Sequence, residues 1–113
     1  MANKEHLDLI KQGVEVWNKW RGENTGEIPD ISRANLIVAD LEGADLSKAD
    51  LIEANLSGAD LRTPHVTVDQ LAEAKSLYKA KLLPKTETEL REKYPERYKE
   101  LIKKPVEPDN ETK

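Results

Sequence analysis

The sequence predicts an all-β solenoid with helical caps, in which the chain coils over itself and short helices cover the two ends. Three observations support this fold class: a five-residue repeat from residue 32 to residue 63, an amphipathic segment before it, and possible helix starts after it. The repeat is considered first, because a fixed short period constrains the whole architecture more than any single element does.

Each repeat unit ends in leucine and carries alanine two residues earlier. A period of five fits neither the period of a helix, about 3.6 residues, nor that of a strand, about two residues. In an extended chain, residues two apart point to the same side, so each unit offers one small and one large apolar side chain to a common interior. The chain must then turn before the next unit. The predicted structural core is Ala34, Leu36, Ala39, Leu41, Ala44, Leu46, Ala49, Leu51, Ala54, Leu56, Ala59 and Leu61.

The A(D/N)LXX motif of these units resembles the repeat of the pentapeptide-repeat proteins. This resemblance implies a right-handed quadrilateral β-helix, with one unit on each of four faces and about two coils in this chain. Residues 20 apart in the sequence are then expected to lie above one another, at the strand spacing of about 4.8 Å. The expected pairs include Asn35 over Asn55, Asp40 over Asp60 and Asp45 over His65. The flanking stretches Gly-Val-Glu-x-Trp-Asn-x-Trp and Leu-Arg-x-Lys-Tyr-Pro are similar to those of small bacterial members of the family.

The chain divides into five predicted segments around this repeat. They are an N-terminal amphipathic capping helix with a linker (1–30), the pentapeptide-repeat β-helix (31–66), a C-terminal cap made of a short helix and an extended segment (67–83), a charged helical segment (84–104) and a disordered tail (105–113).

Residues 4–20 have the apolar spacing of one amphipathic helix, through Leu7, Ile10, Val14 and Trp17. Asn3 is expected to cap its start, and Gly22 to end it. An exposed stripe of this kind would favour aggregation. The pattern therefore favours a lid over the open first coil rather than a groove-binding or membrane helix.

The C-terminal flank contains two possible capping boxes. Thr67 with Gln70 predicts a short helix over about residues 68–76, followed by an extended segment that closes the last coil and ends at Pro84. Thr86 with Glu89 predicts a second helical stretch through residue 102, which Pro95 should divide or kink. The tyrosine stripe of this stretch could pack on the repeat or mediate a homodimer through the C-terminal segment.

Composition excludes several classes of site. The chain has no cysteine, which rules out disulfides, thiolate catalysis and cysteine metal ligands. Two isolated histidines with scattered carboxylates do not form a ligand set, and no phosphate-binding loop is present. We therefore predict no catalytic residue, no metal site and no cofactor. No apolar run long enough to span a membrane and no signal-like segment occurs, so the expected location is cytoplasmic.

The predicted function is a non-enzymatic protein–protein interaction or scaffold module whose partner is another protein. The candidate interaction surface comprises Ile37, Val38, Ile52, Asp40, Asp45 and Asp60. Ile37 and Val38 occupy positions that should face solvent. Either the N-terminal helix folds back over them, or they form a docking patch.

Two other functions stay open from the sequence. Some proteins that this one resembles act as acidic DNA mimics on a type II topoisomerase, and residues 31–66 carry six acidic and three basic residues, a net charge of −3. Two coils would span only about 10 Å, enough to imitate roughly six phosphates. The same acidic balance argues against direct nucleic-acid binding. The second alternative is a minimal enzyme in which Asp45 orients His65.

Overall fold

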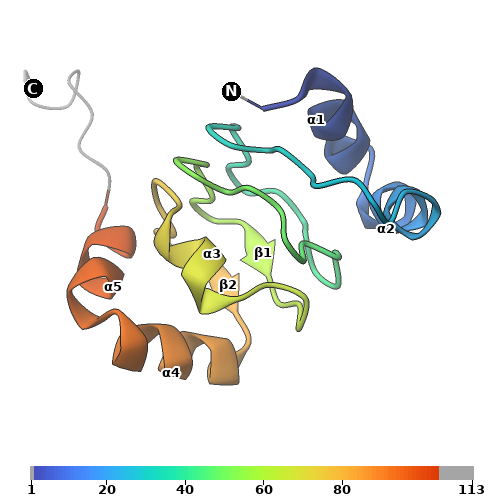
Figure 1. Cartoon of the computed structure of the whole chain (residues 1–113). Coiled ribbons are helices and arrows are strands. Elements are labelled where there is room, and N and C mark those ends of the chain that lie inside the picture. The colour runs from blue at the N-terminus through green and yellow to red at the C-terminus, as the bar shows by residue number, and fades with distance from the viewer. Residues whose placement is uncertain (1, 105–113) are drawn as a thin grey trace, which may run out of the picture.

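The computed structural model describes residues 2–104. In chain order these residues form α1 (Lys4–Lys11), α2 (Val14–Glu23), β1 (Asp60–Leu61), α3 (Val68–Ala72), β2 (Lys81–Leu82), α4 (Pro84–Lys93) and α5 (Pro95–Leu101). Figure 1 shows the repeat segment between two groups of helices, with α1 and α2 at one end and α3, α4 and α5 at the other. The predicted tail, residues 105–113, lies outside the described residues.

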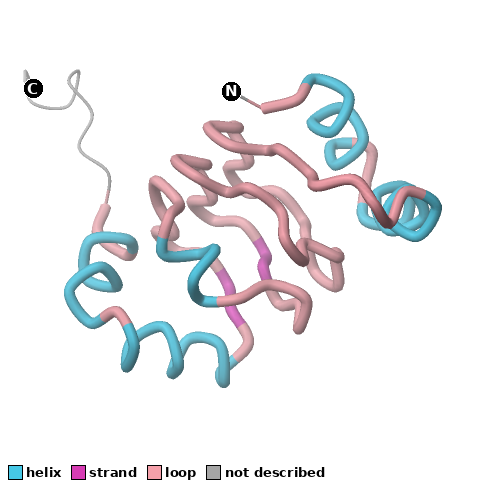
Figure 2. The backbone as a smooth tube through the Cα atoms, in the orientation of Figure 1, coloured by secondary structure: helices cyan, strands magenta, loops and turns pink. Residues whose placement is uncertain are grey.

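The predicted fold class, an all-β solenoid built as a right-handed quadrilateral β-helix, is wrong. Within residues 2–104 the chain is rich in helix, and its only strands are two residues each, paired in parallel in an open two-stranded sheet. Figure 2 shows that most of the repeat segment is loop and turn. The physical reason is the short unit: after one residue has paired with a neighbouring segment, the next turn begins, so a longer ladder cannot form.

The chain nevertheless returns to the same position every four units. The N–H of Leu36 donates to the carbonyl of Asn55 at 2.9 Å, and the N–H of Asp60 donates to the carbonyl of Ala39 at 2.9 Å. Parallel bridges join Asn35 to Asn55 and Asp40 to Asp60, which confirms these two predicted pairs. We call residues 29–82, in which segments about 20 residues apart are hydrogen bonded, the repeat stack.

The turns between units share one geometry. Each alanine N–H donates to the carbonyl three residues before it, as from Ala59 to Leu56 at 3.0 Å. The residue directly before the alanine has a positive φ, as the third residue of a type II turn requires. Residues with this conformation are Arg33, Val38, Gly43, Lys48, Glu53, Gly58 and Lys79.

The Asp or Asn of each unit stabilises the turn that follows. Its side-chain oxygen accepts a hydrogen bond from the backbone N–H two residues later, as an Asx turn does. These pairs are Asp30 with Ser32, Asn35 with Ile37, Asp40 with Glu42, Asp45 with Ser47, Asp50 with Ile52, Asn55 with Ser57 and Asp60 with Arg62. The motif therefore needs Asp or Asn for local geometry and not only for solubility.

The core lies inside the repeat stack and continues into both groups of helices. Eleven of the twelve predicted core residues are buried, and Ala39 is only partly buried. Trp17 and Ile10 join this core from one end, while Leu90 and Leu101 join it from the other. Burying these flanking side chains supplies apolar contacts that a short repeat lacks on its own.

The N-terminal flank forms two helices, so the prediction of one helix over residues 4–20 is wrong. The break falls at Gly13, whose φ of 116° lies outside the helical range, and Gly22, the predicted end, lies inside α2. Asn3 does cap α1, as predicted, by accepting from the N–H of His6. The expected packing against the repeat is confirmed, because Trp17 is fully buried and donates to the carbonyl of Asp45 at 2.8 Å.

The C-terminal flank confirms one of the two predicted capping boxes. Thr67 and Gln70 exchange hydrogen bonds at the start of α3, which ends at Ala72, earlier than expected. The second box is wrong, because α4 begins at Pro84, where the missing N–H of proline is tolerated. Pro95 begins α5, so the predicted division into two helices is confirmed.

The helices α4 and α5 pack on the repeat stack. The guanidinium of Arg97 donates to the carbonyls of Ala72 and Ala74, and the N–H of Leu77 donates to the carbonyl of Leu101 at 2.8 Å. One fork-shaped side chain thus satisfies two acceptors at the last turn of the stack.

We predict that Gly58→Ala destabilises the protein more than Gly43→Ala. Both glycines have positive φ, 71° and 77°, so each alanine incurs the left-handed penalty of about 1–2 kcal/mol. At Gly58 the new Cβ would also lie 2.9 Å from Cγ1 of Val38, whereas nothing lies within 4 Å at Gly43. Urea unfolding should show a loss about 1 kcal/mol larger for Gly58→Ala. Equal losses would contradict the proposed contact.

We also predict that Arg97→Lys lowers the free energy of unfolding by about 1–2 kcal/mol, because an ammonium cannot reproduce the two-carbonyl fork. The matched control is Arg91→Lys, since Arg91 lies on α4 over the ring of Tyr98 without capping the stack. Its expected loss is below about 0.5 kcal/mol. Similar unfolding midpoints for the two variants would show that Arg97 acts only as a surface charge.

Candidate interaction surface

One face of the repeat stack carries no charged residue at the Asp/Asn position. Bridges join Asn35 to Asn55 and Asn55 to Ser76, so these three residues lie in adjacent segments. The other units have aspartate at this position, at residues 40, 45, 50 and 60. We call the surface formed by Asn35, Asn55 and Ser76, with Ile37, Val38 and Ile52 at its borders, the uncharged face.

The apolar residues at the borders of the uncharged face are exposed. The exposed fractions are 45% for Ile37, 74% for Val38 and 40% for Ile52. The N-terminal helices therefore do not cover Ile37 and Val38, and the expectation that they fold back over this pair is wrong. The reason is the position of the helices, whose capping contacts reach the backbone of Asp30 and Asp45 instead.

Val38 is held in an unfavourable backbone conformation on this surface. Its φ is 54°, in the left-handed region that β-branched residues rarely adopt. Most equivalent turn positions carry glycine or a long charged residue. Conformations of this kind typically cost on the order of 1–3 kcal/mol and are often found at functional sites.

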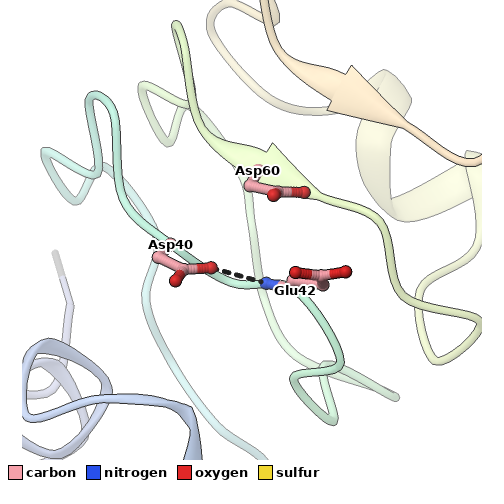
Figure 3. A group of neighbouring side chains, drawn as sticks. All are labelled: Asp40, Glu42 and Asp60. Atoms are coloured by element: carbon pink, nitrogen blue, oxygen red, sulfur yellow. Dashed lines mark hydrogen bonds between the residues drawn. The ribbon is translucent and has the colours of Figure 1, made fainter.

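Asp40 and Asp60 meet at an acidic cluster on a neighbouring face. Figure 3 shows Asp40 and Glu42 from one segment beside Asp60 of β1, and one carboxylate oxygen from each lies within 4.8 Å of the others. Arg62 donates to the two carboxylate oxygens of Asp60 at 2.9 and 2.6 Å, and its guanidinium lies 3.9 Å from the carboxylate of Glu42. The positive charge that a cation would supply is therefore already provided by an arginine.

The hydrogen bond from Arg62 lowers the pKa of Asp60 to about 2, and its positive charge adds to this effect against a small opposing contribution from burial. Asp60 is thus ionised throughout the neutral range and bound to its own neighbour. Its side chain is 17% exposed. The arrangement indicates a structural ion pair, although weak binding of an external cation remains chemically compatible with Asp40 and Glu42.

Asp45 and His65 do not form a hydrogen bond among the residues that the structure describes. The carboxylate of Asp45 accepts from the N–H and Oγ of Ser47, at 3.1 and 2.6 Å. Burial opposes ionisation of Asp45, but these bonds and the charges of Arg21 and His65 lower its pKa. His65 is exposed, and no nucleophile lies in contact with it within the described ranges. The structure therefore gives the predicted enzyme alternative no assembled site.

Sequence reasoning placed these carboxylates correctly but did not identify their role. The signal was available, since Asp or Asn recurs at the residue whose side chain can reach the N–H two positions later. The uncharged face could also have been found, because Asn35 and Asn55 lie 20 residues apart in a repeat that otherwise carries aspartate.

Among residues 2–104, no helix is both long enough and apolar enough to cross a membrane. This finding concerns α1 and α2 in particular, because their apolar residues had raised the question of a membrane helix.

Comparison with protein families agrees with the motif. Residues 30–63 match the family model described as pentapeptide repeats, in 8 copies. No curated protein and no solved structure matches the chain. The matched range contains the complete set of units from which the resemblance was inferred, and the family prediction is confirmed. The chain belongs to the pentapeptide-repeat proteins.

Proposed function

We propose that this protein is an interaction module that binds a partner protein through the uncharged face. Pentapeptide repeats suggest a protein-interaction or structural module, and the proposal selects the first of these roles. The observation that carries it is the exposure of Ile37, Val38 and Ile52 around a surface whose central polar residues are neutral.

The composition of this surface suits a protein partner. Interface centres are poor in charged residues and are surrounded by a polar rim. The uncharged face has neutral Asn35 and Asn55 at its centre, while Arg33 and Glu53 occupy turn positions at its border. Desolvating amides and isoleucine side chains costs less than desolvating the carboxylates of the other faces.

The strained position of Val38 adds support. A glycine at this position would relieve the left-handed backbone at no steric cost. Selection for an exposed apolar side chain here is explained by contact with a partner, whereas stability alone does not explain it.

The acidic faces give less support to a DNA mimic directed at a topoisomerase. Such a mimic needs free, regularly spaced negative charges. Asp60 is bound by Arg62, and Asp45 is partly buried and bound by Ser47. The proposal therefore assigns binding to the apolar border residues and a turn-stabilising role to these aspartates.

The test is affinity capture from lysate of the source organism, read by quantitative mass spectrometry. The full chain is compared with Ile37→Ser/Ile52→Ser and with the control Ile28→Ser, which changes another exposed isoleucine, 67% exposed, outside the repeat units. We expect a partner whose recovery falls at least about tenfold with the double variant, a loss of about 1.4 kcal/mol, and stays unchanged with the control.

A further variant, Asp40→Asn/Asp45→Asn/Asp60→Asn, keeps the side-chain oxygen that each turn requires and removes three charges. Recovery of the partner should survive this change. Loss of topoisomerase subunits with the triple variant alone, or equal recovery of every captured protein with all variants, would contradict the proposal. Circular dichroism and unfolding midpoints should first establish that all variants are folded.

A further inference from the structure

The first turn of the repeat stack presents an edge of backbone groups toward α1 and α2. In a parallel pair, alternate residues direct their N–H and C=O groups to opposite sides. The carbonyl of Ala39 and the N–H of Leu41 both bond to Asp60 in the next segment. The N–H and C=O of Asp40, between them, must therefore point away from the stack, and the same argument applies to Asn35 beside Asn55.

Two of the four equivalent edge positions are capped by the helices. At Asp30, the carbonyl accepts from the N–H of Asn3 at 2.9 Å, and the N–H donates to Nδ1 of His6 at 3.0 Å. At Asp45, the N–H donates to Oδ1 of Asn18 at 2.8 Å. The carbonyl of Asp45 accepts from the indole N–H of Trp17 and from the guanidinium of Arg21, at 2.8 and 3.2 Å.

The other two positions are left open. Within residues 2–104, no donor or acceptor bonds the backbone N–H or C=O of Asn35 or Asp40. These are also the only exposed residues at the Asp/Asn position between Asp30 and Asp60 in the described chain. The partial exposure of Ala39, the one predicted core residue that is not buried, has the same cause. We call the backbone groups of Asn35 and Asp40 the open edge.

Two adjoining hollows lead to the open edge from the junction of α1 and α2. One, of about 310 Å³, is lined by Ile10 and Lys11 on one side and by Asn35, Ile37 and Asp40 on the other. The second, of about 290 Å³, extends from Asp40 and Glu42 to residues 12–16. Gly13 and Asp40 line both hollows, so the helix break at Gly13 lies next to the unpaired backbone of Asp40.

The second hollow is acidic. Glu15, Asp40 and Glu42 contribute carboxylates to its lining, and no lysine or arginine does. Glu15 forms no ion pair with any residue in the described part of the chain. Lys11 lines only the first hollow. A ligand that reaches Asp40 from this side would therefore meet a negative potential.

We propose that the open edge at Asp40 binds a short, extended, basic segment of a partner polypeptide. A residue with one carbonyl before it and one N–H after it can bond to the N–H and C=O of Asp40, as the segment around Ala39 and Leu41 already does with Asp60 on the opposite side. Main-chain pairing with an exposed edge supplies affinity, and side-chain pockets supply specificity. A lysine or arginine of the segment lies against Glu15 and Glu42.

The proposed site is distinct from the proposed function, because it uses backbone groups at the end of the stack rather than the isoleucines beside the uncharged face. Its length is limited, since the chain turns at Ile37 and Val38 between the two open positions. A straight segment can pair with one position at a time. Asp40 is favoured over Asn35 because both hollows and the acidic lining meet there.

Amide hydrogen exchange of the full chain, followed by NMR, tests whether the edge is open. The N–H groups of Asn35 and Asp40 should exchange at least about tenfold faster than those of Asp30 and Asp45, which occupy equivalent positions but are capped. Equal protection of all four amides would overturn the proposal, because it would show that the edge is already paired.

Peptide titration tests the ligand. The probe is acetyl-Val-Lys-Val-Lys-Val-amide, and its expected effect is a shift of amide resonances centred on Asp40. A version with Glu in place of Lys, and a version with a methylated central nitrogen, should each bind at least about tenfold more weakly. Equal binding of the methylated peptide would show that charge alone is recognised and would reject main-chain pairing.

Substitutions in the acidic lining complete the test. Glu15→Gln/Glu42→Gln should weaken binding of the lysine peptide at least about threefold, whereas the control Asp50→Asn/Glu73→Gln, which removes two charges elsewhere, should not. Equal effects of the two variants, or shifts centred away from residues 35–42, would overturn the proposal. This test uses purified protein, so its result is independent of capture from lysate.

Discussion

The hydrogen bond from the side chain of each Asp or Asn to the N–H two residues later is the interaction on which the repeat stack depends. It closes the start of every turn and leaves the next residue but one in the left-handed conformation. Alanine and leucine can point inward only because the turn is closed in this way. The acidic character of the repeat is therefore in large part a consequence of local backbone geometry.

A stack of this size must also satisfy the backbone at its two ends. The structure uses side chains for this purpose, with Trp17 and Arg21 at the first turn and Arg97 at the last. The same side chains bring apolar neighbours with them, so capping and core formation are coupled. Unequal capping at the first turn distinguishes the faces from one another and leaves Asn35 and Asp40 available. The differences that support an interaction role thus arise from the flanks rather than from the repeat.

The sequence predicted the buried residues well because a strict period determines which side chains share an interior, and only Ala39 departs from that pattern. It did not predict the class of fold, because the family resemblance implied continuous strands, whereas the five-residue unit leaves only two-residue strands. The break at Gly13 and the start at Pro84 were missed, since spacing alone cannot distinguish a helix interior from a glycine or proline terminus. The open edge was not predictable, because it depends on which side chains of α1 and α2 reach which carbonyls.

The return of the chain after every four units limits how such a protein can change in length. Insertion of one unit would turn the C-terminal helices by one face relative to α1 and α2, while insertion of four would restore their relative orientation and lengthen the stack by about 4.8 Å. Duplications that preserve the geometry between the two ends must therefore occur in steps of about 20 residues. Shorter insertions would produce a molecule with the same caps aimed in a new direction, which offers a simple route to altered partner geometry without any change in the core.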